Sequence, residues 1–137
     1  MSELSAVRII QLPKLEDPRG NLTFIEENKH IPFIIKRLYW IYDVPGGQIR
    51  GSHAFRSTNE FIIALSGSFD VVLSDGKTES SYTLNRSYFG LLIPELVWRR
   101  IENFSTNSLC LILSSTEYSP DDYIRDFNIF KKMINVR

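Results

Sequence analysis

Short apolar and β-branched segments, each about as long as one strand, follow one another along most of this chain. The breaks between them include Asp17-Pro18-Arg19-Gly20 and Pro45-Gly46-Gly47, which favour turns. Ser74-Asp75-Gly76-Lys77 predicts a tight hairpin. The segments lie at 7–12, 21–26, 33–42, 61–65, 68–73, 81–84, 90–93 and 108–114. Many short strands at this spacing predict an all-β fold, closed into a barrel or a sandwich so that few strand edges stay unpaired.

The pattern changes after Ser119. This serine, followed by Pro120 and two aspartates, is typical of a helix N-terminus. Apolar residues then recur at helical spacing, namely Tyr123, Ile124, Phe127, Phe130, Met133 and Ile134. We expect a single domain across 1–137, with a barrel at about 5–117 and one C-terminal helix at about 120–134. The aromatic residues of this helix either pack against the barrel or a partner subunit, or belong to a ligand site.

The charges and the single cysteine exclude several classes of function. Sixteen Lys and Arg residues balance sixteen Asp and Glu residues, so no basic excess indicates binding to nucleic acid or to an anionic membrane. Cys110 lies in an apolar run, which excludes a disulfide framework and predicts a buried, unreactive thiol. No apolar stretch approaches the roughly 20 residues of a membrane span, and no signal peptide is recognisable. We therefore expect a cytoplasmic protein.

Two histidines limit the acid–base chemistry that is available. His30 ends a run of polar residues, which indicates a solvated loop position. His53 follows Arg50-Gly51-Ser52 and precedes a strongly apolar segment, so we expect its side chain to point into the sheet interior. Alternation along an extended chain would place Phe55 on the same face. A histidine in this position is either structural or a proton carrier, and its neighbours leave both possibilities open.

The stretch from His53 through Glu60 to Gly67 resembles the first motif of the cupins, whose barrels often hold a metal ion. In that motif a second histidine stands where this chain has Phe55. A transition-metal site needs at least three well-placed donors, and His53 with Glu60 supplies two. We therefore predict a barrel without a bound metal.

A closer resemblance covers nearly the whole chain, and it is to the WxcM-like, or sugar 3,4-ketoisomerase, branch of the cupins. The matching segments are Pro18-Arg19-Gly20-Asn21-Leu22, Glu26-Glu27-Asn28, Ile31-Pro32-Phe33, Lys36-Arg37-Leu38-Tyr39, Arg50-Gly51, His53-Ala54, Ser66-Gly67-Ser68, Gly90-Leu91, Val97-Trp98-Arg99, Asn103-Phe104-Ser105 and Asp122-Tyr123-Ile124-Arg125. The resemblance implies a cupin (jelly-roll) β-barrel with a C-terminal helix, assembled as a homodimer that often exchanges N-terminal strands. It also implies a dTDP-linked 4-keto-6-deoxyhexose as substrate, on a route to the deoxysugars of surface polysaccharides.

Moving a ketone to the neighbouring carbon requires a base, an acid and a group that stabilises an enediolate, and it requires no cofactor. The resemblance implies that His53 is the remaining acid–base group. The family has a second histidine where Phe55 stands, and phenylalanine cannot accept a proton. Glu60 is either a substitute base in an apolar interior or a glutamate that closes a surface turn.

Arginines and one tyrosine are the candidates for substrate binding. Arg19 and Arg99 match family positions that tune the stereochemistry at carbon 4, although Arg19 in a turn and Arg99 beside Arg100 also fit exposed positions. Arg37, Arg50 and Arg99 are candidates for the pyrophosphate. Tyr39 shares a strand face with Arg37, and Phe55 would line the same pocket.

Three functions follow from these residues. The first is a sugar-nucleotide 3,4-ketoisomerase. The second is a binding or regulatory module that has lost the reaction together with the second histidine. The third is a related isomerase in which Glu60 and His53 form the acid–base pair.

Overall fold

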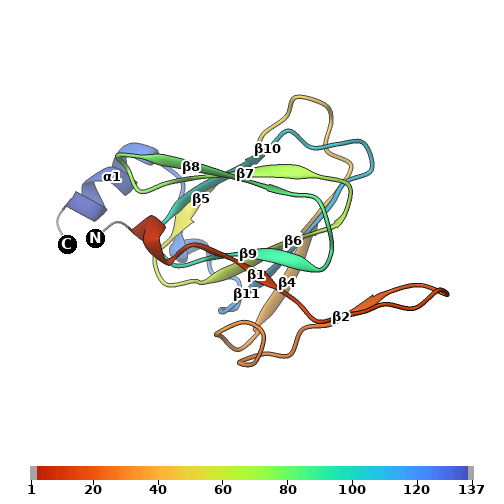
Figure 1. Cartoon of the computed structure of the whole chain (residues 1–137). Helices are drawn as coiled ribbons and strands as arrows, with labels where there is room; N and C mark the ends of the chain where they lie inside the picture. Colours follow the sequence, from red (N-terminus) through yellow and green to blue (C-terminus); the bar gives the residue numbers. More distant parts are fainter. Residues whose placement is uncertain (1–2, 136–137) are drawn as a thin grey trace.

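The computed structural model describes residues 3–135, and antiparallel strands are their main regular secondary structure (Figure 1). One five-stranded sheet, which we call the β4 sheet, has the order β1-β9-β6-β11-β4. The other, which we call the β5 sheet, has the order β12-β5-β10-β7-β8. The two sheets face each other as a barrel, so the all-β barrel expected from the sequence is confirmed. Their strands are β1 (Arg8–Gln11), β4 (Arg37–Ile41), β5 (Arg50–Phe55), β6 (Glu60–Ser66), β7 (Phe69–Ser74), β8 (Glu79–Leu84), β9 (Phe89–Ile93), β10 (Trp98–Glu102), β11 (Leu109–Ser114) and β12 (Tyr123–Ile124).

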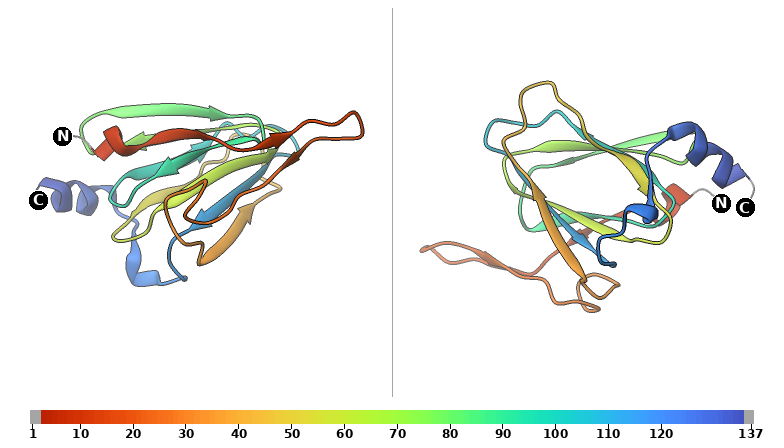
Figure 2. Two further views of the ribbon diagram at one scale, coloured as in Figure 1. Left: turned by 60° about the horizontal axis from the view of Figure 1, so that its bottom comes forward. Right: turned by 180° about the vertical axis from the view of Figure 1, so that it is seen from behind.

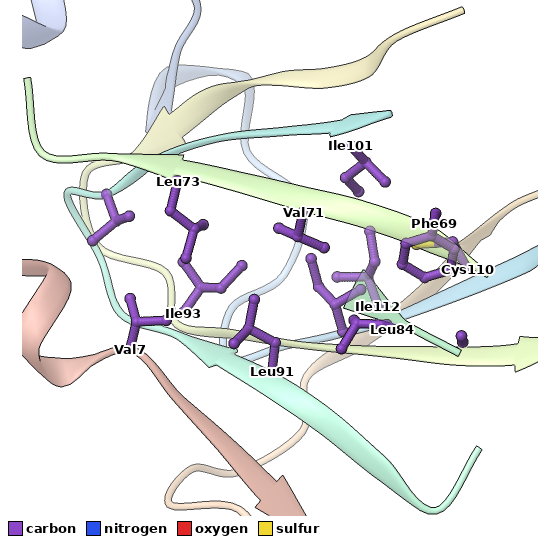
Figure 3. Packing of buried hydrophobic residues seen from close by; sticks show 13 residues of the cluster. Val7, Phe69, Val71, Leu73, Leu84, Leu91, Ile93, Ile101, Cys110 and Ile112 are labelled. Carbon is purple, nitrogen blue, oxygen red and sulfur yellow. The ribbon is translucent and has the colours of Figure 1, made fainter. Parts of the chain in front are cut away.

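Apolar side chains from both sheets fill much of the space between them (Figure 3). Val71 and Leu73 of β7 lie opposite Leu91 of β9 and Ile112 of β11, and all four are essentially inaccessible to solvent. Cys110 lies in the same cluster, where burial raises the pKa of its thiol to about 12. The predicted buried thiol is therefore confirmed.

Short elements lie at the two opposite ends of the barrel (Figure 2). The hairpin of β2 (Lys14–Leu15) and β3 (Leu22–Thr23), which we call the arm, projects from one end. A 3-10 turn (Glu3–Ala6) and the C-terminal helix α1 (Phe127–Asn135) lie at the other end. Phe130 of α1 is fully buried against Trp98 of β10, so the helix packs on the barrel.

The predicted start of the helix is wrong. Only Pro120–Asp122 form a 3-10 turn after Ser119, and the serine side chain makes no capping hydrogen bond. Tyr123 and Ile124 are extended because they pair with the edge of β5. The helix begins at Phe127, and the Asp126 carboxylate accepts from the backbone N–H groups of Asn128 and Ile129, at 2.8 and 3.1 Å.

Four strands were missed, namely the two-residue strands β2 and β12 together with β5 and β10, and two other strands were predicted much too long. The inward face carries Gly51 and His53 in β5 and Arg99 in β10, so neither strand shows a regular apolar alternation. The segment at 33–42 is a strand only from Arg37, and the one at 21–26 only at Leu22–Thr23. The predicted hairpin is confirmed: β7 and β8 pair up to Ser74 and Glu79, and Gly76 has φ of 92°.

Candidate active site

Polar side chains from both sheets meet inside the barrel, beside the line where the edge strand β4 approaches β5 and β12. His53 and Arg99 are directly paired across β5 and β10. Glu60 of β6 and Tyr39 of β4 reach the same region from the opposite sheet, because both hydrogen-bond to Arg99. The site is thus a polar cluster inside an otherwise apolar barrel.

A buried ion pair joins the two sheets at this cluster. Arg99 and Glu60 are each only 1% exposed, and Arg99 Nε donates to Glu60 Oε1 at 2.8 Å. Arg99 Nη2 donates to Glu60 Oε2 at 3.2 Å and to the Tyr39 hydroxyl at 3.0 Å. The Tyr39 hydroxyl in turn donates to Glu60 Oε2. Burial opposes the charge of Arg99, but Glu60 and Tyr39 outweigh it, so the pKa of Arg99 is raised and the residue stays cationic.

Gly51 makes room for the remaining donor of Arg99. Its carbonyl accepts from Arg99 Nη1 at 2.9 Å, and a Cβ atom at this position would lie 2.1 Å from the same nitrogen. Gly51 also has φ of 70°, in the left-handed region that glycine adopts without strain. The local register of β5 and β10 shifts between Arg99 and Ile101. These features let the chain bend around the guanidinium two residues before His53.

His53 is buried between two aromatic rings. Its ring centroid lies 4.8 Å from that of Phe55 and 4.9 Å from that of Tyr123, both in edge-on contacts. The side chain is 6% exposed, and its Nε2 atom is buried without a hydrogen-bond partner. Burial, together with the positive charges of Arg99, Arg125 and Arg37, lowers the pKa of His53 to about 2. The imidazole is therefore neutral at physiological pH.

Arg37 is half-buried at the edge of this cluster. Its Nη1 donates to the Tyr123 hydroxyl at 3.3 Å and its Nη2 to Ser114 Oγ at 3.2 Å. The guanidinium lies over the rings of Tyr39 and Tyr118, with its carbon atom 5.1 and 5.5 Å from their centroids. Its Nε atom is buried without a partner. No carboxylate among the described residues forms an ion pair with it.

The structure gathers six of the eight residues singled out from the sequence. They are His53, Glu60, Arg37, Tyr39, Phe55 and Arg99, which form one network of hydrogen bonds and ring contacts.

The other two residues, both arginines, lie outside this network. The side chain of Arg19 is 91% exposed near the tip of the arm, where Asp17 binds it at 2.9 Å. Arg50 begins β5 and is exposed, and it lines a separate surface hollow of about 420 Å³ beside Trp40 and Tyr42.

Three alternatives from the sequence are settled by burial and contacts. Glu60 does not close a surface turn, because it is buried and both of its oxygens are engaged. Arg99 and Arg100 are not an exposed pair: Arg99 points inward, whereas Arg100 binds Glu79 and Glu102, each at 3.2 Å. His30 is a half-buried loop residue whose Nδ1 accepts from the backbone of Glu26 at 2.8 Å.

Sequence reasoning missed Tyr123. Its segment belongs to the matching Asp122-Tyr123-Ile124-Arg125 stretch, but the preceding helix signal assigned it to the apolar face of the C-terminal helix. In the structure Tyr123 pairs with Phe55 across β12 and β5, and its ring also lies 4.6 Å from that of Phe55. The signal that could have found Tyr123 is that the edge of β5 would otherwise expose unpaired backbone groups, so another segment has to pair with it.

The surface hollows lie apart from His53, and the described residues hold no cluster of metal donors. Hollows of about 740, 420 and 410 Å³ lie on the surface, and His53 lines none of them. Within residues 3–135, no three His, Cys, Asp or Glu side chains gather as a metal site requires. No helix in the same range is both long and apolar enough to cross a bilayer.

Known proteins resemble this chain over almost its full length. A TDP-4-oxo-6-deoxy-alpha-D-glucose-3,4-oxoisomerase of Aneurinibacillus thermoaerophilus is 40% identical over 93% of this chain and 91% of its own. A crystal structure of a 3,4-ketoisomerase from Helicobacter canadensis is also 40% identical, covers 94% of this chain and 97% of its own, and superposes with a TM-score of 0.92.

The sugar 3,4-ketoisomerase QdtA of Thermoanaerobacterium thermosaccharolyticum, in complex with TDP, is 34% identical over 95% of both chains, with a TM-score of 0.93. Residues 5–135 match the family described as FdtA: WxcM-like, C-terminal. Because both the sequence and the fold match over almost the full length, the chain belongs to the FdtA, WxcM-like family of cupin-type proteins.

Proposed function

We propose that this protein is a sugar-nucleotide 3,4-ketoisomerase that acts on a dTDP-linked 4-keto-6-deoxyhexose. The observation that carries the proposal is a neutral, buried imidazole near two arginines: Arg99, which is paired with Glu60, and Arg37, whose Nε has no partner. Relatives at 34–40% identity with nearly complete coverage support it, because they are named as isomerases of this kind. A variant of the Thermoanaerobacterium protein was crystallised with TDP-4-keto-6-deoxyglucose. The product would serve cytoplasmic synthesis of deoxysugars for surface polysaccharides.

The reaction moves one carbon-bound proton and one hydroxyl proton. His53 takes the proton from carbon 3, the electrons of that C–H bond form a double bond between carbons 3 and 4, and the carbonyl electrons move to the oxygen on carbon 4. The resulting enediolate passes its remaining hydroxyl proton from the oxygen on carbon 3 to the oxygen on carbon 4. Carbon 4 then takes back the proton held by His53. No cofactor is needed, because no electrons leave the substrate.

A second candidate function is a binding module without catalysis, and Phe55 favours it. The aromatic ring occupies the position next to His53 where the family resemblance implies a second histidine. Phe55 is buried and cannot carry a proton. Such a protein would retain affinity for the nucleotide sugar while leaving its carbon-bound protons in place.

Proton exchange with the solvent separates the two functions. The purified protein is incubated in deuterium oxide with dTDP-4-keto-6-deoxyglucose, and the sugar is analysed by mass spectrometry and NMR. Deuterium at carbon 3 or carbon 4 that depends on His53 supports the isomerase, and a His53→Asn variant is the matched control. Tight binding of dTDP, measured by calorimetry, without deuterium uptake supports the binding module.

The proposal includes a homodimer. The outer face of the β4 sheet carries an apolar groove of about 740 Å³, lined among others by Phe24, Leu38, Leu65 and Leu111. Leu15 and Leu22 of the arm are also more than half exposed. Apolar surface of this extent is typical of an interface between subunits. Sedimentation analysis tests this: wild-type protein is expected to be dimeric, and Leu65→Asp is expected to be monomeric.

A further inference from the structure

The two arginines inside the barrel differ in their partners. Each nitrogen of Arg99 donates a hydrogen bond, to Glu60, to the Tyr39 hydroxyl or to the Gly51 carbonyl. Its charge is balanced by the Glu60 carboxylate at 2.8 Å. Arg99 therefore has little capacity left for a substrate, because an additional anion would have to displace Glu60.

Arg37 is in the opposite situation. Its two hydrogen-bond partners, Tyr123 and Ser114, are neutral hydroxyls, and its Nε–H is buried without an acceptor. An unbalanced guanidinium and an unpaired buried donor each carry a free-energy cost, which an anionic oxygen at this place would remove. The free nitrogen indicates where a ligand oxygen is missing.

Tyr123 connects this cation to the imidazole. Its hydroxyl accepts from Arg37 Nη1 at 3.3 Å, while its ring lies 4.9 Å from that of His53. His53 Nε2 and Arg37 Nε are the two buried side-chain polar atoms without a partner among residues 3–135, and both belong to residues in contact with Tyr123. A base and a hydrogen-bond donor therefore stand unpaired on either side of one tyrosine.

The charges around His53 leave Arg37 as the available cation. Arg99 of β10 is neutralised by Glu60 of β6, and Tyr39 of β4 is a protonated hydroxyl because burial raises its pKa. Arg125, which follows β12, is exposed and lies over the Tyr123 ring, its guanidinium carbon 4.3 Å from the centroid. Among these groups, Arg37 alone combines a buried free donor with an unbalanced charge.

We propose that Arg37 is a catalytic residue that donates to the substrate oxygen on carbon 4, and that Tyr123 is the positioning residue that holds it there. This inference rests on the proposed isomerase function. When the C–H electrons move into the double bond between carbons 3 and 4, the carbonyl oxygen becomes negative, and the Arg37 donor stabilises it. The pyrophosphate is then left to other groups, so Arg37 affects turnover more than nucleotide affinity.

The experiment measures kcat and KM for dTDP-4-keto-6-deoxyglucose and the dissociation constant of dTDP. Arg37→Met is expected to lower kcat by roughly 100-fold to 1,000-fold, the usual effect of removing one donor to a developing oxyanion. Tyr123→Phe removes only the hydroxyl that holds Arg37 and is expected to lower kcat by about tenfold. Both should leave the dissociation constant of dTDP within about threefold of wild type, since neither acts on the nucleotide. Arg100→Met, which removes a cation of β10 bound by Glu79 and Glu102, is the matched control and should leave both quantities unchanged.

Two results would overturn the inference alone. In one, the wild type is active and Arg37→Met retains its kcat while KM and the dissociation constant of dTDP rise together, which would assign Arg37 to the pyrophosphate. In the other, Tyr123→Phe matches the wild type in every constant. Circular dichroism checks that each variant folds, and if Arg37→Met does not, Arg37→Lys and Tyr123→Phe decide the question. If the wild-type protein instead shows no deuterium uptake, the proposed function is refuted, and the inference about Arg37 is refuted with it.

Discussion

Acid should destabilise this protein through His53. The unfolded chain binds a proton at this imidazole below about pH 6.5, whereas burial and the nearby arginines lower its pKa in the native state to about 2. The unfolded state therefore binds more protons between these two values. His53 contributes its full stability above pH 6.5 and loses it as the pH falls, at about 1.4 kcal/mol per pH unit. Between pH 7.5 and pH 4.5 the loss is about 2.7 kcal/mol, and it is the same for any native pKa below about 3.5.

Urea unfolding at one fixed protein concentration measures this loss. Carboxylates also titrate in this range, so the quantity of interest is the difference between the wild type and His53→Gln. The gap between their free energies of unfolding should change by about 2.7 kcal/mol from pH 7.5 to pH 4.5, with the wild type losing more. Parallel curves for the two proteins would refute the reasoning.

NMR provides a direct check on the same group. The chain has two histidines, so the imidazole spectrum contains two signals, and His53→Gln assigns them. The His53 signal should keep its neutral position from pH 8 to pH 4.5. A midpoint near pH 6 would mean that burial does not hold the imidazole neutral.

Three further changes test the surroundings of His53. Glu60→Ala leaves Arg99 buried without a counter-ion and should lower the free energy of unfolding by about 3–5 kcal/mol. In the same urea titrations, Glu60→Leu combined with Arg99→Met should recover much of that loss. An equal loss in both variants would contradict the ion-pair account. Gly51→Ala combines a left-handed φ with a Cβ clash and should cost about 1–3 kcal/mol in the same assay, and a melting temperature like that of the wild type would show that the strand relaxes freely. Phe55→His should raise deuterium uptake at the sugar if the second acid–base group is what the native chain lacks, whereas lower uptake would show that the phenylalanine ring belongs to a different working site.

The fold was largely predictable because its core strands carry the apolar pattern that a buried sheet face requires. Two of the strands that build the site, β5 and β10, were not, because polar residues interrupt the apolar pattern of their inward faces. β5 has Gly51 and His53 where a core strand would have apolar residues, and β10 has Arg99. Sequence patterns therefore detect least well the strands on which the chemistry depends.

Six residues of the polar cluster were named from the sequence and the family resemblance, but Tyr123 and the contacts among them were not. Nothing in the sequence pairs Glu60 with Arg99, since their strands lie in different sheets and 39 positions apart. Tyr123 was misassigned because Ser-Pro-Asp-Asp is a genuine local helix signal that lost to pairing with β5. Long-range pairing overrode local preference at the residue that contacts both His53 and Arg37.

Arg99 spans the barrel from β10 to β6 and β4, and its hydrogen bonds form a brace between the two sheets. At this end of the barrel, hydrogen-bond lengths fix the distance between the sheets, whereas elsewhere the packing of apolar side chains fixes that distance. Substitutions in the apolar layer around Val71 and Leu91 should consequently alter stability without widening the polar end. A redesign meant to admit a bulkier sugar would have to begin with the brace itself.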